Sequence, residues 1–280
     1  MAKILDGKQV VASLNEKLRA EVERLKGVGI APTLAIVRLG ERPDDISYER
    51  GAMKRAETVG VAVKQYVLPA ESSQEELLDL IQSINTDETI SGLLLFRPLP
   101  KHIDEETVRN AISPQKDVDG ITDLSLAGVF TASGQGYPPC TAQACLETFD
   151  HFGIELKGKR VVMIGRSLVV GKPLAMMMLG RHATVTICHT RTVDMPALVR
   201  EAEIVIAAAG KAKVVGSDFF APGQIVLDVG INVDEAGNLC GDADFAAAEQ
   251  VVEAITPVPG GIGTVTTSVL LKHVIAAAEK

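Results

Sequence analysis

Two segments in the second half of the sequence combine residue types that favour binding of a phosphate-bearing ligand. Residues 161–173 (VVMIGRSLVVGKP) run from a β-branched stretch into a glycine turn at 165–167 and then into a helix that opens near Gly171. Backbone N–H groups at such a helix N-terminus face an anion, as in dinucleotide-binding folds. Residues 255–266 (ITPVPGGIGTVT) place prolines and glycines in one loop, whose restricted backbone another molecule can approach closely. Together the segments predict an enzyme with two substrates, one of them a nicotinamide cofactor.

The residues after the second strand of this half bear on the choice between NAD and NADP. In a dinucleotide fold, an Asp or Glu about 20 residues after the glycine turn binds the ribose of NAD, whereas Arg accommodates the 2′-phosphate of NADP. Here the stretch ATVTICH is followed by Thr190 and Arg191 with no carboxylate, and Arg166 supplies a second guanidinium. Guanidinium groups suit bidentate phosphate binding, so we predict NADP, with NAD as the alternative. The competing interpretations are a glycine turn that serves packing alone and a solvated Arg191.

The composition limits the class of protein. The chain has 280 residues, 46% of them hydrophobic, which suffices for one large or two smaller globular domains. Its formal net charge of −8 argues against nucleic acid or an anionic membrane as the partner. The four cysteines form no CxxC pair, so we expect no metal site, no disulfide framework and a cytoplasmic location. No apolar run approaches membrane-spanning length.

The hydrophobic pattern predicts an α/β fold with two domains. The first half has the order β-α-β-α-β, which implies a parallel sheet with right-handed crossovers. Its predicted elements are a surface helix over 7–26, strands 33–39, 61–68 and 91–96, and helices 47–59 and 73–85. A turn-rich stretch over 113–139 marks the domain transition, and a linking helix follows over 141–152.

The second half repeats the pattern as a Rossmann-type unit. Its predicted elements are strands 160–164, 183–188, 203–207 and 224–229 and helices 172–180 and 194–201. Residues 264–280 read as an amphipathic helix that packs back on the first domain. The expected domain boundaries are 1–140 and 141–264. Because ligands of open parallel sheets bind at the carboxyl ends of the strands, we expect the site in a cleft between the domains.

Six segments that span essentially the whole chain carry a family resemblance. They are KDVDG (116–120), PPCT (138–141), GRSLVVGKP (165–173), DVGIN (228–232), GDADF (241–245) and ITPVPGGIG (255–263). By these motifs the chain resembles the bifunctional methylenetetrahydrofolate dehydrogenase/methenyltetrahydrofolate cyclohydrolase family. The resemblance implies an N-terminal α/β folate-binding domain, a C-terminal Rossmann domain and a homodimer. It also implies hydride transfer from 5,10-methylenetetrahydrofolate to NADP, and then hydration of the methenyl cation to 10-formyltetrahydrofolate.

The resemblance also implies individual site residues. The cofactor contacts are Gly165, Arg166, Ser167, Thr190 and Ile231, to which the charge argument adds Arg191. The substrate contacts are Tyr48, Phe96, Pro98, Asp119, Pro259 and Gly260, of which Tyr48 and Asp119 take catalytic roles. A carboxylate at Asp119 suits the two adjacent N–H donors of a pterin. The alternative is a turn-forming Asp before Gly120.

The chain departs from the family pattern in its first domain. Family members carry Tyr-x-x-x-Lys on a helix and a Gln on the strand before a PLP turn. This chain keeps Tyr48, but Ala52 occupies the lysine position and Phe96 the glutamine position. At about 100° per residue, Lys54 faces away from Tyr48, while Arg55 lies about 10 Å farther along the helix axis. Neither cation therefore replaces the lysine.

The missing polar groups affect the two reactions of the family differently. Hydride transfer moves no proton and mainly needs two carbons held close and aligned. Hydrolysis of the methenyl cation needs a positioned water and general acid–base catalysis, for which a lysine of tunable pKa is suited. The sequence therefore predicts a dehydrogenase whose cyclohydrolase activity is weak or absent.

Three other interpretations stay open. In a fully bifunctional enzyme, Tyr48 and ordered water would hydrolyse the methenyl product. An amino-acid or shikimate-type dehydrogenase shares the two-domain plan but needs a Lys–Asp pair, and no lysine is obviously paired with Asp119. A non-catalytic NADP-binding sensor would bind the cofactor without turnover.

Overall fold

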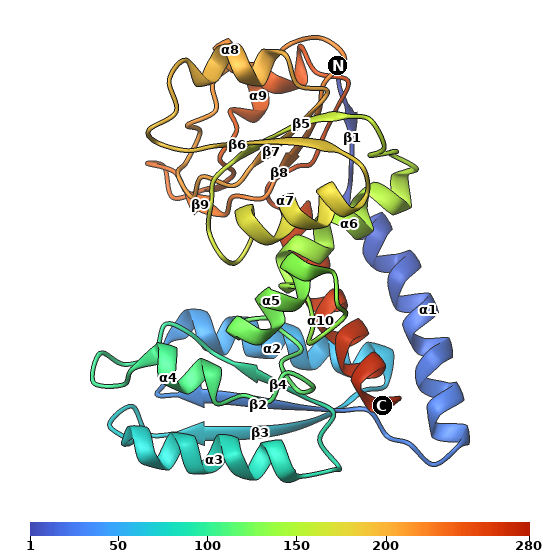
Figure 1. Ribbon diagram of the computed structural model, residues 1–280, viewed down its shortest axis with the longest axis vertical. Helices are drawn as coiled ribbons and strands as arrows, with labels where there is room; N and C mark the ends of the chain where they lie inside the picture. The colour runs from blue at the N-terminus through green and yellow to red at the C-terminus, as the bar shows by residue number, and fades with distance from the viewer. The chain divides into compact units, whose positions relative to one another are not determined.

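The computed structural model describes all 280 residues, which divide into two compact units (Figure 1). Unit 1 consists of residues 1–13 and 141–266, and unit 2 of residues 14–140 and 267–280. None of the helices has the length and apolarity that a membrane span requires. All four cysteines are reduced and buried.

Unit 2 contains a three-stranded parallel sheet in the order β3-β2-β4. Its strands are β2 (Thr33–Leu39), β3 (Ala62–Leu68) and β4 (Gly92–Leu95), and its helices are α2 (Pro43–Val59), α3 (Gln74–Thr86), α4 (Glu105–Asn110) and α5 (Asp123–Thr131). Residues of α3 and α4 pack on the sheet face that carries Val37 and Leu95. Leu34 and Ile36 point to the opposite face and are also buried, so β2 is covered on both sides. This double cover explains why β2 is a continuous apolar run.

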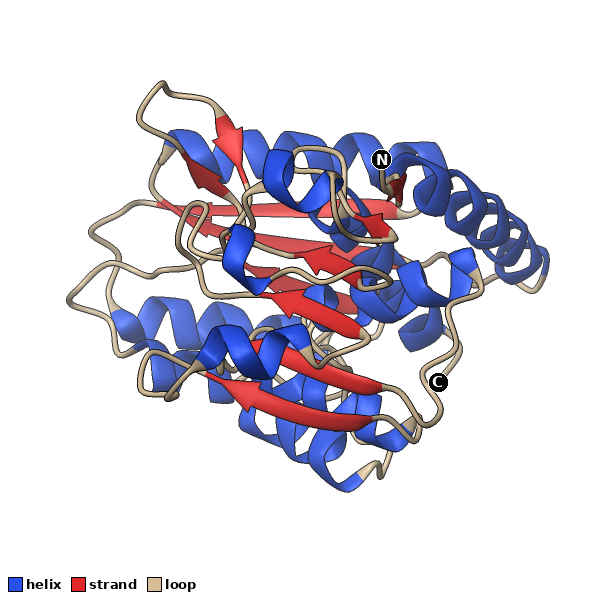
Figure 2. Ribbon diagram, turned by 90° about the horizontal axis from the view of Figure 1, so that it is seen from above, coloured by secondary structure: helices blue, strands red, loops and turns tan.

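Unit 1 contains a six-stranded parallel sheet in the order β1-β11-β8-β7-β5-β6. Its strands are among the red arrows of Figure 2. The strands are β1 (Lys3–Ile4), β5 (Arg160–Ile164), β6 (Thr184–Cys188), β7 (Ile204–Ala207), β8 (Ile225–Asp228) and β11 (Ala254–Ile255). The helices are α6 (Cys140–Phe152), α7 (Gly171–Gly180), α8 (Met195–Arg200), α9 (Phe245–Glu249) and a 3₁₀ turn over Ser217–Phe219. A two-stranded hairpin joins β9 (Asn232–Val233) to β10 (Leu239–Cys240).

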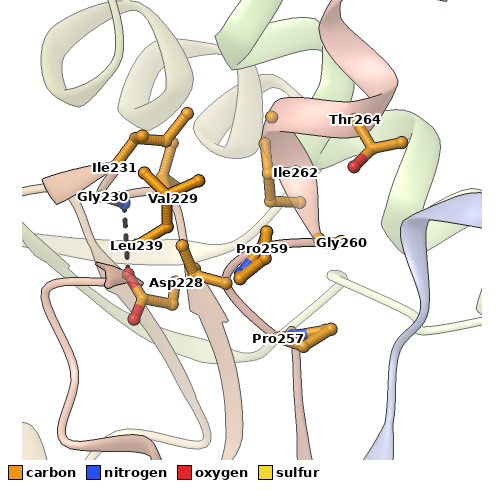
Figure 3. Close-up of a pocket in the computed structure, with 13 residues that line it drawn as sticks. Asp228, Val229, Gly230, Ile231, Leu239, Pro257, Pro259, Gly260, Ile262 and Thr264 are labelled. Atoms are coloured by element: carbon orange, nitrogen blue, oxygen red, sulfur yellow. Dashed lines mark hydrogen bonds between the residues drawn. The ribbon is translucent and has the colours of Figure 1, made fainter. Parts of the chain in front are cut away.

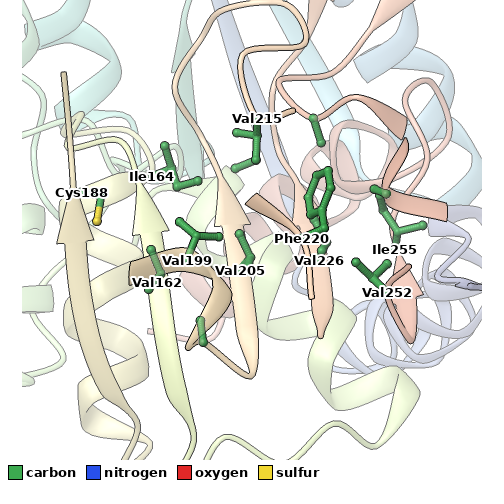
Figure 4. Packing of buried hydrophobic residues seen from close by; sticks show 14 of the residues in the cluster. Val162, Ile164, Cys188, Val199, Val205, Val215, Phe220, Val226, Val252 and Ile255 are labelled. Carbon is green, nitrogen blue, oxygen red and sulfur yellow. The ribbon is translucent and has the colours of Figure 1, made fainter. Parts of the chain in front are cut away.

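The core of unit 1 consists mainly of β-branched side chains from neighbouring strands (Figure 4). Val162, Val205 and Val226 come from β5, β7 and β8, and Ile255 adds β11. Each of the four is at most 4% exposed. Burial of one such side chain contributes about 1.5–3 kcal/mol, so this layer fixes the sheet whose strand ends carry the loops described below.

The first 13 residues correct the predicted domain boundary. They belong to unit 1 and not to the first domain, because β1 pairs in parallel with β11 through Lys3 opposite Ala254 and Ile4 opposite Ile255. Two helices, α1 (Gly7–Gly27) and α10 (Ile262–Ala278), therefore begin in unit 1 and end in unit 2.

Two helix predictions also need correction. Helix α2 begins at Pro43 and not near Ser47, because proline at the first helical position and the acidic Asp44 and Asp45 favour a helix start. Helix α10 is not amphipathic, since nearly every turn of it is buried. Its buried apolar side chains are Ile262, Val265, Val269, Leu270, Leu271, Val274 and Ile275.

Candidate functional site

The glycine turn of unit 1 connects the end of β5 to the start of α7. Gly165 has φ +127°, and a Cβ built on it would lie 2.0 Å from the carbonyl oxygen of Ala208. A Cβ on Gly171 would lie 2.3 Å from the Gly165 carbonyl oxygen. The Ser167 hydroxyl accepts a hydrogen bond from the Val170 N–H at 3.1 Å. Only glycine fits these two positions, and the turn brings backbone N–H groups to the helix start where a phosphate binds.

A pocket of about 270 Å³ opens beside this turn. Four residues predicted to bind the cofactor line it, namely Gly165, Arg166, Ser167 and Thr190. The other lining residues are Ile164, His189, Met195, Ala208, Ala209, Val214, Val215 and Phe219. A polar rim with apolar walls fits the phosphate and adenosine portion of a dinucleotide.

Arg191, predicted as a cofactor contact, does not line this pocket. Its side chain is exposed, and its backbone N–H donates to Nδ1 of His189 at 3.1 Å. Sequence reasoning missed His189 and the apolar wall from Ala208 to Phe219. The run of small residues after β7 was the available signal, because small side chains leave room for a ligand at a strand end.

A second pocket of unit 1, of about 130 Å³, lies at the ends of β8 and β11 (Figure 3). Pro259 and Gly260, predicted for the substrate, share it with Ile231, predicted for the cofactor. Gly260 has φ +105°, and a Cβ on Gly261 would lie 2.4 Å from the Pro257 carbonyl oxygen. The proline–glycine loop is therefore tightly folded, as its composition predicts. Leu239 and Thr264 also line the pocket and had no distinguishing sequence signal.

In unit 2, Tyr48 and Phe96 lie against each other. Their ring centroids are 5.7 Å apart and their planes are 80° to one another, which is an edge-to-face contact. Tyr48 on α2 is 42% exposed, whereas Ala52, one turn farther along, is completely buried. At the two positions where the sequence analysis expects a lysine and a glutamine in the family, the structure has the buried methyl group of Ala52 and the aromatic ring of Phe96.

Asp119 is the last residue of the SPQKDVD segment (113–119) and is partly buried. Its pKa is raised to about 6, chiefly because burial removes water from the carboxylate and secondarily because Asp117 is negative. The Arg97 guanidinium and a hydrogen bond from the Cys140 thiol act in the opposite direction. The turn-forming role belongs to Asp117, whose carboxylate accepts from the backbone N–H groups of Ile121 and Thr122 at 3.0 and 2.8 Å.

A buried ion pair, missed from the sequence, ties α2 to the sheet of unit 2. Arg38 Nε on β2 lies 3.0 Å from Oε2 of Glu49 on α2, and the two residues are 8% and 4% exposed. Gln65 on β3 donates to the other oxygen of Glu49 at 2.9 Å. Glu49 follows Tyr48 directly, so this pair holds the helix that presents Tyr48. The sequence feature that indicates this ion pair is an arginine inside the otherwise apolar strand TLAIVRL.

Two family models match the chain over nearly its full length. The catalytic domain of tetrahydrofolate dehydrogenase/cyclohydrolase matches residues 5–119, and its NAD(P)-binding domain matches residues 139–280. The chain belongs to the tetrahydrofolate dehydrogenase/cyclohydrolase family. The bifunctional protein FolD of Clostridioides difficile is 48% identical over 276 residues, which are 99% of this chain and 96% of that protein.

Solved structures of this family have the same fold. The bifunctional FolD enzyme of Campylobacter jejuni is 36% identical with a TM-score of 0.96, over 100% of this chain and 99% of the other. The Trypanosoma brucei enzyme, solved with NADP cofactor and an inhibitor, is 34% identical with a TM-score of 0.92, over 99% and 97%. The predicted two-domain α/β class, with a catalytic domain followed by a Rossmann-like domain, is confirmed, and the matched second domain is an NAD(P)-binding domain.

Proposed function

We propose that this member of the tetrahydrofolate dehydrogenase/cyclohydrolase family oxidises 5,10-methylenetetrahydrofolate to 5,10-methenyltetrahydrofolate and hydrolyses the product weakly or not at all. The observation that carries the proposal is the site of unit 2, where Ala52 is completely buried and Phe96 packs on Tyr48. NADP, when bound, supplies the hydride acceptor. The dehydrogenase step needs from the protein only binding and alignment of the two reactants.

The hydrolysis step needs a group that takes a proton from water, and neither the methyl group of Ala52 nor the ring of Phe96 can do so. Arg97 is the nearest cation in sequence to Phe96, but its guanidinium lies 3.3 Å from Oε1 of Glu105, and a guanidinium has no acceptor site for a proton. The Phe96 ring instead offers a face to the cationic product.

A stopped assay of the purified protein tests this proposal. With 5,10-methylenetetrahydrofolate and NADP, methenyl product should build up in step with reduced cofactor. Drainage of the methenyl absorbance to the formyl product faster than in buffer would instead make the protein fully bifunctional. Cofactor binding without any turnover would make it a sensor.

Asp119 should give folate binding a characteristic pH dependence. Only the ionised carboxylate accepts both pterin N–H bonds, and its pKa of about 6 means that this form is lost as the pH falls through that value. The KM for methylenetetrahydrofolate should therefore be constant above about pH 7 and rise about tenfold for each pH unit below 6. Steady-state kinetics from pH 5 to 8 measure this. Asp119→Asn should show a high KM that no longer varies with pH, while a pH-dependent KM in that variant would exclude the assignment.

We propose that the enzyme prefers NADP to NAD through Arg166 and Arg191. Replacing both by serine should lower kcat/KM with NADP by about 100-fold or more and leave NAD nearly unaffected, because each charge-assisted bond to a phosphate is worth about 1.5–3 kcal/mol. Arg181→Ser is the matched control, since Arg181 lies at the opposite end of α7 and pairs with Asp150. Equal losses with both cofactors would contradict the assignment.

We also propose that the protein is a homodimer in the cytoplasm. On the hairpin of β9 and β10, Val233 and Leu239 are 63% and 51% exposed, and exposed apolar side chains of this kind favour an interface. Light scattering should give twice the monomer mass of 29.7 kDa.

A further inference from the structure

Two buried carboxylates of unit 1 lie outside the residues assigned so far to substrate or cofactor contact. Asp228 ends β8 and is 2% exposed, and Asp242 follows β10 and is completely buried. Neither forms an ion pair. A buried carboxylate without a cation is costly unless hydrogen bonds saturate it, so its partners reveal its role.

The partners of Asp242 are three consecutive backbone amides and one side chain. Its Oδ2 accepts from the N–H groups of Ala209 and Gly210 at 2.5 and 2.9 Å. Its Oδ1 accepts from the N–H of Lys211 and from Nδ2 of Asn232, each at 2.9 Å. One side chain thus holds the loop that follows β7 and, through Asn232, the loop that follows β8.

Asp228 holds Asp242 in place. Its Oδ1 accepts from the Gly230 N–H at 3.1 Å, the bond drawn in Figure 3, and from the Asp242 N–H at 2.9 Å. Its Oδ2 accepts from the Ala243 N–H at 2.9 Å. Since Ala207 and Asp228 are register partners of β7 and β8, both loops leave the same edge of the sheet.

Close packing connects this network to both pockets. A Cβ on Gly230 would lie 2.2 Å from Oδ1 of Asp242, and Gly230 lines the pocket of Ile231 and Pro259. On the other side, Ala209 lines the pocket of the glycine turn, and the carbonyl oxygen of the adjacent Ala208 abuts Gly165. The carboxylate therefore lies between the walls of the two pockets.

We infer that Asp242 is a positioning residue for the dinucleotide, fixing the Ala209–Lys211 wall of one pocket relative to the Gly230–Asn232 wall of the other. The inference rests on the proposed binding of the cofactor in the pocket of the glycine turn and beside Ile231 in the second pocket. The negative charge of the Asp242 carboxylate strengthens all four of its hydrogen bonds. Without this carboxylate, the N–H groups of the loop would lose their charged acceptor. Neutral hydroxyl or amide side chains offer fewer strong acceptor sites.

The test compares Asp242→Asn with Asp244→Ala. Asp244 lies two residues farther on and caps α9 through the Ala247 N–H at 3.3 Å, so the alanine variant, which removes this cap, should lower the Tm without changing cofactor binding. For Asp242→Asn, titration with reduced NADP should show at least a tenfold weaker Kd, and the KM for NADP should rise more than kcat falls. The milder variant Asn232→Ala removes one of the four hydrogen bonds and should weaken cofactor binding a few-fold. It replaces Asp242→Asn in the test if that variant does not fold.

Three outcomes would overturn the inference or its basis. An unchanged Kd in a folded Asp242→Asn protein, or in Asn232→Ala where that variant replaces it, would refute the positioning role. A loss of affinity that tracks the Tm equally in the Asp242 and Asp244 variants would show a structural role alone. If Arg166→Ser also left the Kd for reduced NADP unchanged, the proposed cofactor pocket itself would be wrong. If Arg166→Ser weakened cofactor binding and Asp242→Asn did not, only the inference about Asp242 would be refuted.

Discussion

The double variant Ala52→Lys with Phe96→Gln should hydrolyse methenyltetrahydrofolate at least about a hundredfold faster than the unmodified protein. General acid–base catalysis by a positioned side chain contributes about 10²- to 10⁴-fold, and this variant restores both polar groups that the chain lacks next to Tyr48. The rate is measured as loss of methenyl absorbance, with the buffer rate subtracted. Dehydrogenase activity should persist, because hydride transfer needs neither group.

Two control variants make this prediction specific. Ala52→Met with Phe96→Gln supplies similar volume without an amine and should show no gain in hydrolysis. Ala52→Lys alone should lower stability, because Ala52 is completely buried and the Phe96 ring offers the ammonium no hydrogen-bond acceptor. A folded double variant with intact dehydrogenase activity and no hydrolysis would show that the missing groups do not explain the proposed loss.

Replacing Arg38 by methionine should destabilise the protein by about 3–5 kcal/mol. The substitution leaves Glu49 as a buried charge that keeps only the hydrogen bond from Gln65, and breaking a buried pair on one side carries this cost. Arg38→Met together with Glu49→Leu should recover most of the loss, since a buried pair can often be replaced by packed apolar groups. Urea unfolding of the single and double variants measures both effects.

An exposed ion pair of the same length provides the comparison. Lys64 Nζ lies 3.0 Å from Oδ2 of Asp87, but both side chains are about a third exposed or more, so Lys64→Met should hardly shift the urea midpoint. Similar shifts for Arg38→Met and Lys64→Met would mean that burial does not decide the contribution of the Arg38 pair. The Arg38 variant should also raise the KM for folate, because Glu49 follows Tyr48 on α2.

Long elements of the fold could be predicted from the sequence because their apolar patterns are extended. Strand β2 was predicted at its observed bounds, Thr33–Leu39, since seven buried positions give an unambiguous run. Strands β1 and β11 have two residues each, which is too short for any periodicity, and their pairing joins positions about 250 residues apart. The missed pairing placed the first 13 residues in the wrong unit.

The site was predictable where backbone geometry dictates residue type and hidden where it does not. Gly165 and Gly171 stand at positions that admit no Cβ, so the turn was visible in the sequence. Asp242 binds backbone amides of Ala209–Lys211, more than 30 residues away, and backbone amides carry no sequence signal. The apolar pocket wall around Val214 was also missed, because its residue types do not differ from those of an ordinary core segment.

The pairing of β1 with β11 has a consequence for how the protein can be made. Strand β1, at the edge of the cofactor-binding sheet, is synthesised about 250 residues before its partner β11, which emerges from the ribosome only after residue 255. Until then the nascent sheet has no β1–β11 edge, and a gene fragment that starts at residue 141 would expose β11 as an open edge that invites association with other chains. Dividing the protein at its apparent midpoint would therefore leave the cofactor-binding piece incomplete. A synthetic peptide of residues 1–13, added in trans, is the natural candidate to restore it.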